Sequence, residues 1–149
     1  MHMEANQQVA TINILLADDD MDDRFFFDKA LKEIPMASQL ITVNNGEQLM
    51  EHLTTHTGPL PDILFLDLSM PRKTGFECLS EIKENEKLKG ITVIMLTTSF
   101  TRGLDLEDNL RKTLIRMGAT DYIRKPVAFD ELKQIIKQAL TNLAAKSGI

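Results

Sequence analysis

Carboxylates gather at one point of the sequence, directly after an apolar run. The segment LLADDDMDD, residues 15–23, places five carboxylates within the six positions 18–23, just after the apolar residues 12–17. Neighbouring negative charges repel one another, and burial increases that cost. A Mg²⁺ ion would neutralise the repulsion, because it binds hard oxygen ligands from carboxylates, water and phosphate. The acidic cluster is therefore a candidate metal site.

Three further polar residues suit phosphoryl chemistry. Asp67 directly follows the apolar letters ILFL, Thr97 follows ITVIML, and Lys125 precedes a proline. With Mg²⁺ held nearby, a carboxylate can attack a phosphoryl group and become an acyl phosphate. Such transfer depends mostly on positioning and charge stabilisation. Lys125 would supply positive charge to the phosphoryl oxygens, and Thr97 a hydrogen-bond donor.

Alternating strands and helices would position these residues. Five short apolar, β-branched runs predict strands at 12–17, 38–43, 62–67, 91–96 and 120–125. Segments of helical periodicity follow each of them, at 22–34, 44–53, 74–86, 106–117 and 128–145. In the first of these helices the inward stripe is predicted to be Phe26, Phe27, Ala30, Leu31 and Ile34. This five-fold strand–helix repeat predicts a doubly wound α/β domain with a parallel sheet.

The predicted topology brings the polar residues together. In an open parallel sheet, function gathers outside the carboxyl ends of the strands. The acidic cluster, Asp67, Thr97 and Lys125 each stand at the carboxyl end of a predicted strand. Loops are wet, so any one polar strand end would be unremarkable by itself. Acid cluster, lone acid, hydroxyl and lysine together favour a functional site.

Composition narrows the function classes. The chain has 149 residues, 43% of them hydrophobic and 26% charged, which suits one soluble domain, and its apolar runs are too short to span a membrane. The first twelve residues do not form a secretory signal, and 1–9 are expected to be a flexible start or a cloning remnant. A net charge of −5 argues against binding nucleic acid. Cys78 stands alone, so an intrachain disulfide is excluded, which suits a reducing cytoplasm; we interpret it as a core residue.

Four motifs in register resemble the receiver domain of two-component response regulators, the CheY-like family. They are NILLADDDMDD, PDILFLDLSMPRKTGFECL, ITVIMLTTS and GATDYIRKPV. The resemblance runs from about Ile12 to Ala144 and is to the stand-alone, single-domain type. It implies a flavodoxin-like (βα)5 three-layer sandwich whose five parallel strands lie in the order 2-1-3-4-5, and one domain over residues 1–149.

The resemblance also implies roles for the acids. Asp67 would be phosphorylated. Asp18 and Asp19 would be the acidic pair that holds Mg²⁺, Asp19 directly and Asp18 largely through water. Asp67 and the backbone carbonyl of Ser69 would complete the metal ligands. Asp20 is left with two interpretations, a residue that tunes metal affinity or a solvated loop charge.

The remaining implied roles lie on the fourth and fifth predicted strands. Thr97 would be the switch hydroxyl, Lys125 the phosphate-binding lysine and Tyr122 the switch aromatic. The Lys125–Pro126 peptide bond is expected to be cis, as in the family, since proline makes that form cheap. Phosphorylation would change the surface formed by residues 106–145.

The implied function is a phosphorelay step in a bacterial cytoplasm. A histidine kinase would donate the phosphoryl group. The sequence as a whole is similar to stand-alone regulators that are partnered with phytochrome-type kinases. Output would be binding of a downstream protein, or onward phosphotransfer, by a monomer or by a dimer formed through residues 106–145. The protein would be a signalling protein rather than an enzyme, although it would catalyse its own phosphorylation and dephosphorylation.

One departure from the family spacing concerns the output surface. Asp67 and Thr97 are 30 residues apart, as is typical, but Thr97 and Lys125 are 28 apart, about six more than the compact pattern. The surplus lies near residues 100–108. We expect a longer loop or an added helical turn there, which puts the output partner in doubt and leaves the phosphorylation chemistry unaffected. A loop insertion without function is equally compatible, since loops absorb residues at little entropic cost.

Two rival functions remain. A Mg²⁺-dependent phosphatase with an aspartate nucleophile would use the same strand-end acids, but it normally needs a second acid where Ser69 stands, and a cap. A receiver-like module that no longer switches is disfavoured by the intact set of acids, Thr97 and Lys125. His52 and His56 have a spacing that zinc could use, but solvent-facing histidines are favoured because no third ligand is near.

Overall fold

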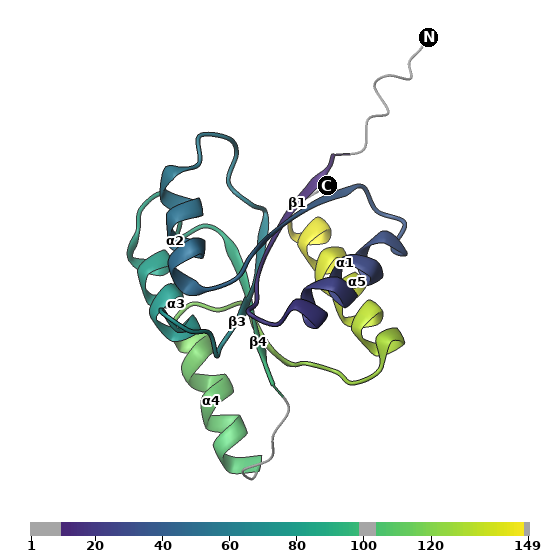
Figure 1. The fold of residues 1–149 in the computed structure, drawn as a ribbon. Coiled ribbons are helices and arrows are strands. Elements are labelled where there is room, and N and C mark those ends of the chain that lie inside the picture. The colour runs from purple at the N-terminus through teal and green to yellow at the C-terminus, as the bar shows by residue number, and fades with distance from the viewer. Residues whose placement is uncertain (1–9, 99–103, 148–149) are drawn as a thin grey trace.

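A five-stranded parallel sheet forms the centre of the molecule. The computed structural model describes residues 10–98 and 104–147 (Figure 1). The strands are paired in the order β2-β1-β3-β4-β5, as expected for the flavodoxin-like fold. Their bounds are β1 (Ile12–Ala17), β2 (Ser38–Val43), β3 (Ile63–Asp67), β4 (Thr92–Thr97) and β5 (Asp121–Arg124). The sequence-based prediction of the fold class is confirmed.

Helices cover both faces of this sheet. They are α1 (Met21–Lys32), α2 (Gly46–Thr55), α3 (Gly75–Glu84), α4 (Leu104–Arg116) and α5 (Phe129–Ser147). Figure 1 shows α1 and α5 on one side of the strands and α2, α3 and α4 on the other. The three-layer arrangement follows from the strict alternation of strands and helices, because right-handed crossovers place successive helices on one face or the other.

The sheet separates two hydrophobic clusters. All five residues of β3 are buried. Leu64 and Leu66 pack with α2, α3 and α4, whereas Ile63 and Phe65 pack with α1 and α5. Side chains alternate along a strand, so a central strand that is covered on both faces must be apolar at every position. The acid that ends β3 interrupts this run at the edge of the sheet, where the functional site lies.

The core stripe predicted for α1 is right except at one position. Phe27, Ala30, Leu31 and Ile34 are buried, but Phe26 is 45% exposed. Ile34 lies beyond the last helical turn, which ends at Lys32. Phe26 and its neighbour Phe25 pack edge to face with a ring-centroid distance of 5.4 Å, so the helix presents two aromatic rings near the surface.

The insertion falls partly outside the described residues. Residues 1–9 and 99–103 lie outside them. The rest of the surplus predicted near 100–108, from Leu104 onward, forms the beginning of α4. In the described part of that helix Leu114 is fully buried and Leu110 packs partly against the core, as does Met117 just beyond the end of the helix. Among the helices that the structure describes, none has the length and apolar character needed to cross a bilayer.

Candidate functional site

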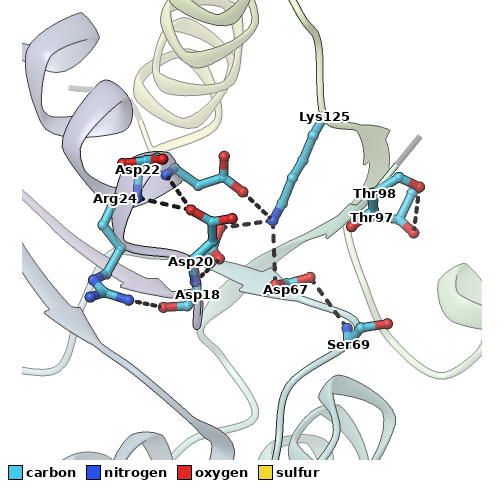
Figure 2. A network of polar contacts seen from close by, with 10 residues as sticks. Asp18, Asp20, Asp22, Arg24, Asp67, Ser69, Thr97, Thr98 and Lys125 are labelled. Carbon is cyan, nitrogen blue, oxygen red and sulfur yellow. Dashed lines mark hydrogen bonds and ion pairs between the residues drawn. The ribbon is translucent and has the colours of Figure 1, made fainter. Parts of the chain in front are cut away.

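The polar strand ends meet at one edge of the sheet. Asp18 directly follows β1, Asp67 ends β3, Thr97 ends β4, and Lys125 directly follows β5. These four strands are neighbours in the order β1-β3-β4-β5. Figure 2 shows the side chains of Asp18, Asp67 and Lys125 directed toward one another. The convergence predicted from the parallel topology is present for Asp18, Asp67 and Lys125, whereas the Thr97 hydroxyl donates to the backbone carbonyl of Thr98 at 3.5 Å.

Lys125 is at the centre of the cluster. Its Nζ lies 2.9 Å from a carboxylate oxygen of Asp18, 2.9 Å from one of Asp23 and 3.3 Å from one of Asp67. The side chains of Asp18 and Asp67 are only 2–3% exposed, and that of Lys125 is 17% exposed. Buried charges are stable only when they are paired. Here one ammonium serves three carboxylates, so negative charge remains in excess.

Three carboxylates form a set that suits a divalent cation. One oxygen from each of Asp18, Asp19 and Asp67 lies within 4.8 Å of the other two. Asp18 and Asp67 are buried, while Asp19 is exposed and can be reached from solvent. Hard carboxylate oxygens that keep water-accessible positions are the ligands that Mg²⁺ prefers. The donor set therefore fits the cation that the sequence predicted.

Burial weakens the acidity of both inner carboxyl groups. Desolvation raises the pKa of Asp67 to about 7, and the charge of Asp18 adds to this; the Lys125 charge and the Ser69 backbone N–H oppose it. The pKa of Asp18 is raised as well, chiefly by burial. Burial lowers the pKa of Lys125, but the hydrogen bonds that its ammonium donates to Asp23 and Asp18 raise the pKa by more, so Lys125 remains cationic. A bound cation would compensate the charge that burial disfavours.

The crowded acids after β1 divide into separate structural roles. Asp20 is the N-cap of α1, and its Oδ1 accepts hydrogen bonds from the backbone N–H groups of Asp22, at 2.8 Å, and Asp23, at 3.1 Å. Asp22 and Asp23 occupy the first helical turn, where negative charge is favourable. Of the two interpretations left for Asp20, neither describes this helix-capping role, which satisfies otherwise unpaired N–H groups.

Backbone hydrogen bonds hold the turn after β3. The N–H of Ser69 donates to Asp67 Oδ1 at 3.2 Å, and the N–H of Leu68 donates to the carbonyl of Leu96 at 2.8 Å. Thr74 then caps α3 in a capping box with Glu77. Strand β4 and helix α3 therefore fix the backbone on either side of the turn, and with it the position of Ser69, whose backbone carbonyl is a predicted metal ligand.

Thr97 and Tyr122 lie together beneath the site. Both are buried, at 5% and 3% exposure. Strands β4 and β5 pair Thr97 with Arg124 and Met95 with Tyr122, which brings the two side chains into one region. Burial raises the pKa of the Tyr122 phenol, the charge of Glu107 adds to it, and a hydrogen bond with Thr97 opposes it. Two residues that are 25 apart in the chain are thus coupled by strand pairing.

The prediction of a cis peptide at Pro126 is wrong. None of the described peptide bonds is cis, so the Lys125–Pro126 bond is trans. The trans form of an X–Pro bond is favoured by roughly 0.5–1 kcal/mol when nothing else selects the isomer. Nothing here requires the cis form, because the long Lys125 side chain reaches all three carboxylates from a trans bond.

Sequence reasoning missed Asp23 as a member of the site. Its carboxylate contacts Lys125 across 102 residues of sequence. The sequence places Asp23 among the five acids of the cluster but predicts no contact or chemical role for it. The available signal was its place in the first turn of the helix after β1, because that turn overhangs the carboxyl edge of the sheet. Arg24 was missed too; its Nη1 donates to the backbone carbonyl of Asp18 at 2.8 Å.

An apolar pocket adjoins the cluster. It has a volume of about 400 Å³ and lies between α1 and the residues from β5 to α5. Asp23 and Lys125 stand at its wall beside Phe26, Phe27 and Phe65. The methylene stem of Lys125 therefore runs along apolar surface while its ammonium meets the acids. Apolar walls lower the local dielectric, which strengthens the charge interactions beside them.

The histidine pair lies away from this cluster, with His52 on α2 and His56 at the C-cap of that helix. The rings of His52 and His56 stack with centroids 4.8 Å apart. Among the described residues, the one group of three or more acidic, histidine or cysteine side chains close enough to share an ion is Asp18, Asp19 and Asp67. Of the two histidines predicted to face solvent, His56 is exposed and His52 is half-buried.

Comparison with known proteins identifies the family. Residues 14–137 match the family model of the response regulator receiver domain. The chain belongs to this family. The receiver domain is 30% identical over 128 residues to the probable methanogenesis regulatory protein FilR2 of Methanothrix harundinacea, covering 84% of this chain and 79% of that one. It is 38% identical over 90 residues to response regulator Rcp1 of Synechocystis sp., covering 58% of this chain and 61% of Rcp1.

Solved structures agree with the fold. The receiver domain superposes on the phosphorylated cyanobacterial phytochrome response regulator RcpA with a TM-score of 0.75 at 30% identity, covering 87% of this chain and 91% of that one. The Mn²⁺-bound form of Rcp1 gives a TM-score of 0.71 at 28% identity, with 85% and 90% covered. A place in two-component signalling is therefore established for this receiver domain.

Proposed function

We propose that this receiver domain accepts a phosphoryl group on Asp67 from a histidine kinase, in a reaction that depends on Mg²⁺. One observation carries the proposal: a buried carboxylate at the end of β3 contacts Lys125 and shares a cation-sized acidic cluster with Asp18 and Asp19. The Mn²⁺-bound form of Rcp1 supports a divalent metal in a structural relative. Phytochrome and bacteriophytochrome response regulators among the structural neighbours support a kinase partner, and the phytochrome type in particular.

The residues divide the work of transfer. Asp18, Asp19, Asp67 and the backbone carbonyl of Ser69 would hold Mg²⁺, which supplies positive charge to the phosphoryl oxygens and keeps Asp67 ionised. One oxygen of Asp67 attacks phosphorus, and the bond from phosphorus to the donor nitrogen of the kinase histidine breaks. The ammonium of Lys125 stabilises charge on the phosphoryl oxygens. Positioning and charge stabilisation are the main requirements of this chemistry.

The switch would act through β4 and β5. The Thr97 hydroxyl moves toward the new phosphoryl oxygens, and the ring of Tyr122 repacks beneath it. Two contacts connect β5 to α4: Arg124 forms an ion pair with Glu107, and the guanidinium of Arg111 lies 5.1 Å from the centre of the Tyr122 ring. Since Glu107 and Arg111 are on α4, this movement reaches the face formed by α4, β5 and α5. That face then binds a downstream protein or a second copy, or the phosphoryl group passes onward. The change is a shift between two packings.

Exposed apolar side chains around the site would meet the kinase. Met21 is 71% exposed, Phe25 is 60% exposed and Val127 is 98% exposed. Met21 and Phe25 lie on the first turns of α1, and Val127 lies on the segment after β5, beside Asp23 and Lys125 of the site. Large exposed apolar groups that rim a polar site are typical of a protein contact. We place the protein in the cytoplasm, where such kinases act on their regulators.

Labelling with acetyl phosphate tests the proposal. The protein is incubated with acetyl phosphate in Mg²⁺ or in EDTA, and the bound phosphate is counted by intact mass. We expect one base-labile phosphoryl group per chain in Mg²⁺ and none in EDTA. Asp67→Asn should abolish labelling, and Asp130→Asn, an exposed acid on α5, should leave it intact.

Two outcomes would replace the proposal. Many turnovers of a small phosphoester, lost in Asp67→Asn, would indicate the phosphatase. Absence of labelling in Mg²⁺, by acetyl phosphate and by a histidine kinase alike, would indicate a receiver-like module that does not use phosphorylation.

A further inference from the structure

The ammonium of Lys125 has three N–H donors and three carboxylate partners. Two of these partners, Asp18 and Asp67, belong to the cation-sized acidic cluster. Asp23 does not belong to it, although its contact with Lys125 is as short as that of Asp18, at 2.9 Å. Of the three acids that contact Lys125, Asp18 and Asp67 could also bind a cation in the cluster, whereas Asp23 contacts the lysine alone.

A bound cation and a phosphoryl group would compete with Lys125 for the carboxylate oxygens of Asp18 and Asp67. A cation in the cluster draws the carboxylate oxygens of Asp18 and Asp67 toward itself. A phosphoryl group on Asp67 removes one of that residue's oxygens from the contact with Lys125. The lysine stem has several rotatable bonds, so an ammonium with no remaining partner at the protein would leave the site for solvent. Asp23 is the partner that neither event consumes.

Asp23 is also held rigidly enough to be an anchor. Its backbone N–H donates to Asp20 Oδ1 at 3.1 Å, within the N-cap of α1. Helix α1 packs along α5 and buries Phe27, Ala30 and Leu31 against the sheet. The carboxylate of Asp23 reaches Lys125 from α1, whereas that of Asp67 reaches it from the end of β3. The lysine is thus held between a fixed helix and the reacting carboxylate.

We propose that Asp23 is a positioning residue for Lys125. It keeps the ammonium at the site while Asp18 and Asp67 bind the cation and the phosphoryl group, and so it sets the rate of phosphoryl transfer without touching either. This role rests on the proposed function. Its effect is on the transition state, where charge on the phosphoryl oxygens is largest, and not on binding of the donor.

Phosphorylation kinetics with acetyl phosphate test this role. We expect Asp23→Asn to lower the rate constant at saturating acetyl phosphate by about tenfold, less than the roughly hundredfold that a 1 Å misplacement can cost, with little change in the half-saturating concentration. Asp22→Asn is the matched control, because it removes the same charge from the same helical turn without a contact to Lys125 in the described network. Asp23→Glu, which keeps a carboxylate, should restore part of the rate.

A double-mutant cycle separates positioning from a general structural effect. In a Lys125→Ala background, Asp23→Asn should have no further effect on the rate, because no ammonium is left to position. Urea unfolding of the same four proteins in EDTA gives a readout that needs no phosphorylation, and there too the two substitutions should be non-additive. Asp22→Asn and Lys125→Ala should be additive in both measurements.

The outcomes distinguish the two levels of the proposal. Equal rates for Asp23→Asn and Asp22→Asn, with the wild type labelled normally, would overturn the positioning role and leave the proposed function standing. Additive effects of Asp23→Asn and Lys125→Ala in both measurements would overturn it as well. A wild type that is not labelled would overturn the proposed function, and this role with it.

Discussion

The backbone carbonyl oxygen of Asp67 lies where a side chain on residue 75 would be. A Cβ built on Gly75 would be 2.5 Å from that oxygen and 2.8 Å from the Cα of Leu68. Gly75 also donates its N–H to the carbonyl of Leu68 at 2.9 Å. The first residue of α3 therefore touches the backbone of the phosphoacceptor turn, and glycine permits this approach because it has no Cβ.

Replacing Gly75 by alanine should displace the turn that carries Asp67. The close atoms are backbone, which cannot rotate away, so we expect a loss of about 1–3 kcal/mol of stability in urea unfolding and a slower rate of phosphorylation. Gly90→Ala is the matched control, because a Cβ there meets nothing within 4 Å. If the two alanine variants behaved alike, the contact between Gly75 and Asp67 would have no energetic importance.

Stability without metal should fall as the pH rises, and Asp67 should be a main cause. Burial raises the pKa of Asp67 to about 7 in the folded protein, above its ordinary value of 3.8. Folding therefore favours the protonated form, so the contribution of this group to stability is complete below its unfolded pKa and is lost as the pH rises through about 7.

Asp67→Asn, which mimics the protonated acid, should then stabilise the metal-free protein more at pH 8 than at pH 5. We expect the stabilisation by this substitution to be about 2 kcal/mol larger at pH 8 than at pH 5, because one titrating group changes the free energy of unfolding by at most roughly 1.4 kcal/mol per pH unit. Urea unfolding in EDTA at the two pH values measures it, with Asp130→Asn as the control. A stabilisation that does not change with pH would contradict the raised pKa.

The N-cap of α1 gives a test of the role assigned to Asp20. Asp20→Ala leaves the N–H groups of Asp22 and Asp23 without their acceptor, so we expect a loss of about 1 kcal/mol in urea unfolding. Asp20→Asn removes the charge and keeps the cap, and its stability should stay close to wild type. Equal destabilisation by the two substitutions would indicate that the charge of Asp20, and not its capping oxygen, is what matters.

Cys78 should be inert in the folded protein. It is fully buried in α3, and burial raises the pKa of its thiol to about 12. Because the thiolate is the reactive form, a disulfide reagent at pH 8 should react only in urea. Rapid reaction under native conditions would show that α3 opens locally or that the thiol is accessible.

Local patterns in the sequence determined the architecture and the residues that stand at the strand ends. The period of apolar residues identifies strands and helices, and the alternation of the two gives a parallel sheet whose carboxyl edge must collect Asp18, Asp67, Thr97 and Lys125. These inferences hold because side-chain alternation and crossover handedness are properties of the backbone itself.

The tertiary structure decided what depends on how the elements dock. The contact of Asp23 with Lys125 requires α1 to lie beside the residue after β5, an arrangement that no local pattern encodes. The exposure of Phe26 depends on how α1 is rotated against the sheet, which the helical period alone does not fix. Each depends on packing between segments far apart in sequence, where small changes of angle move a side chain from core to surface.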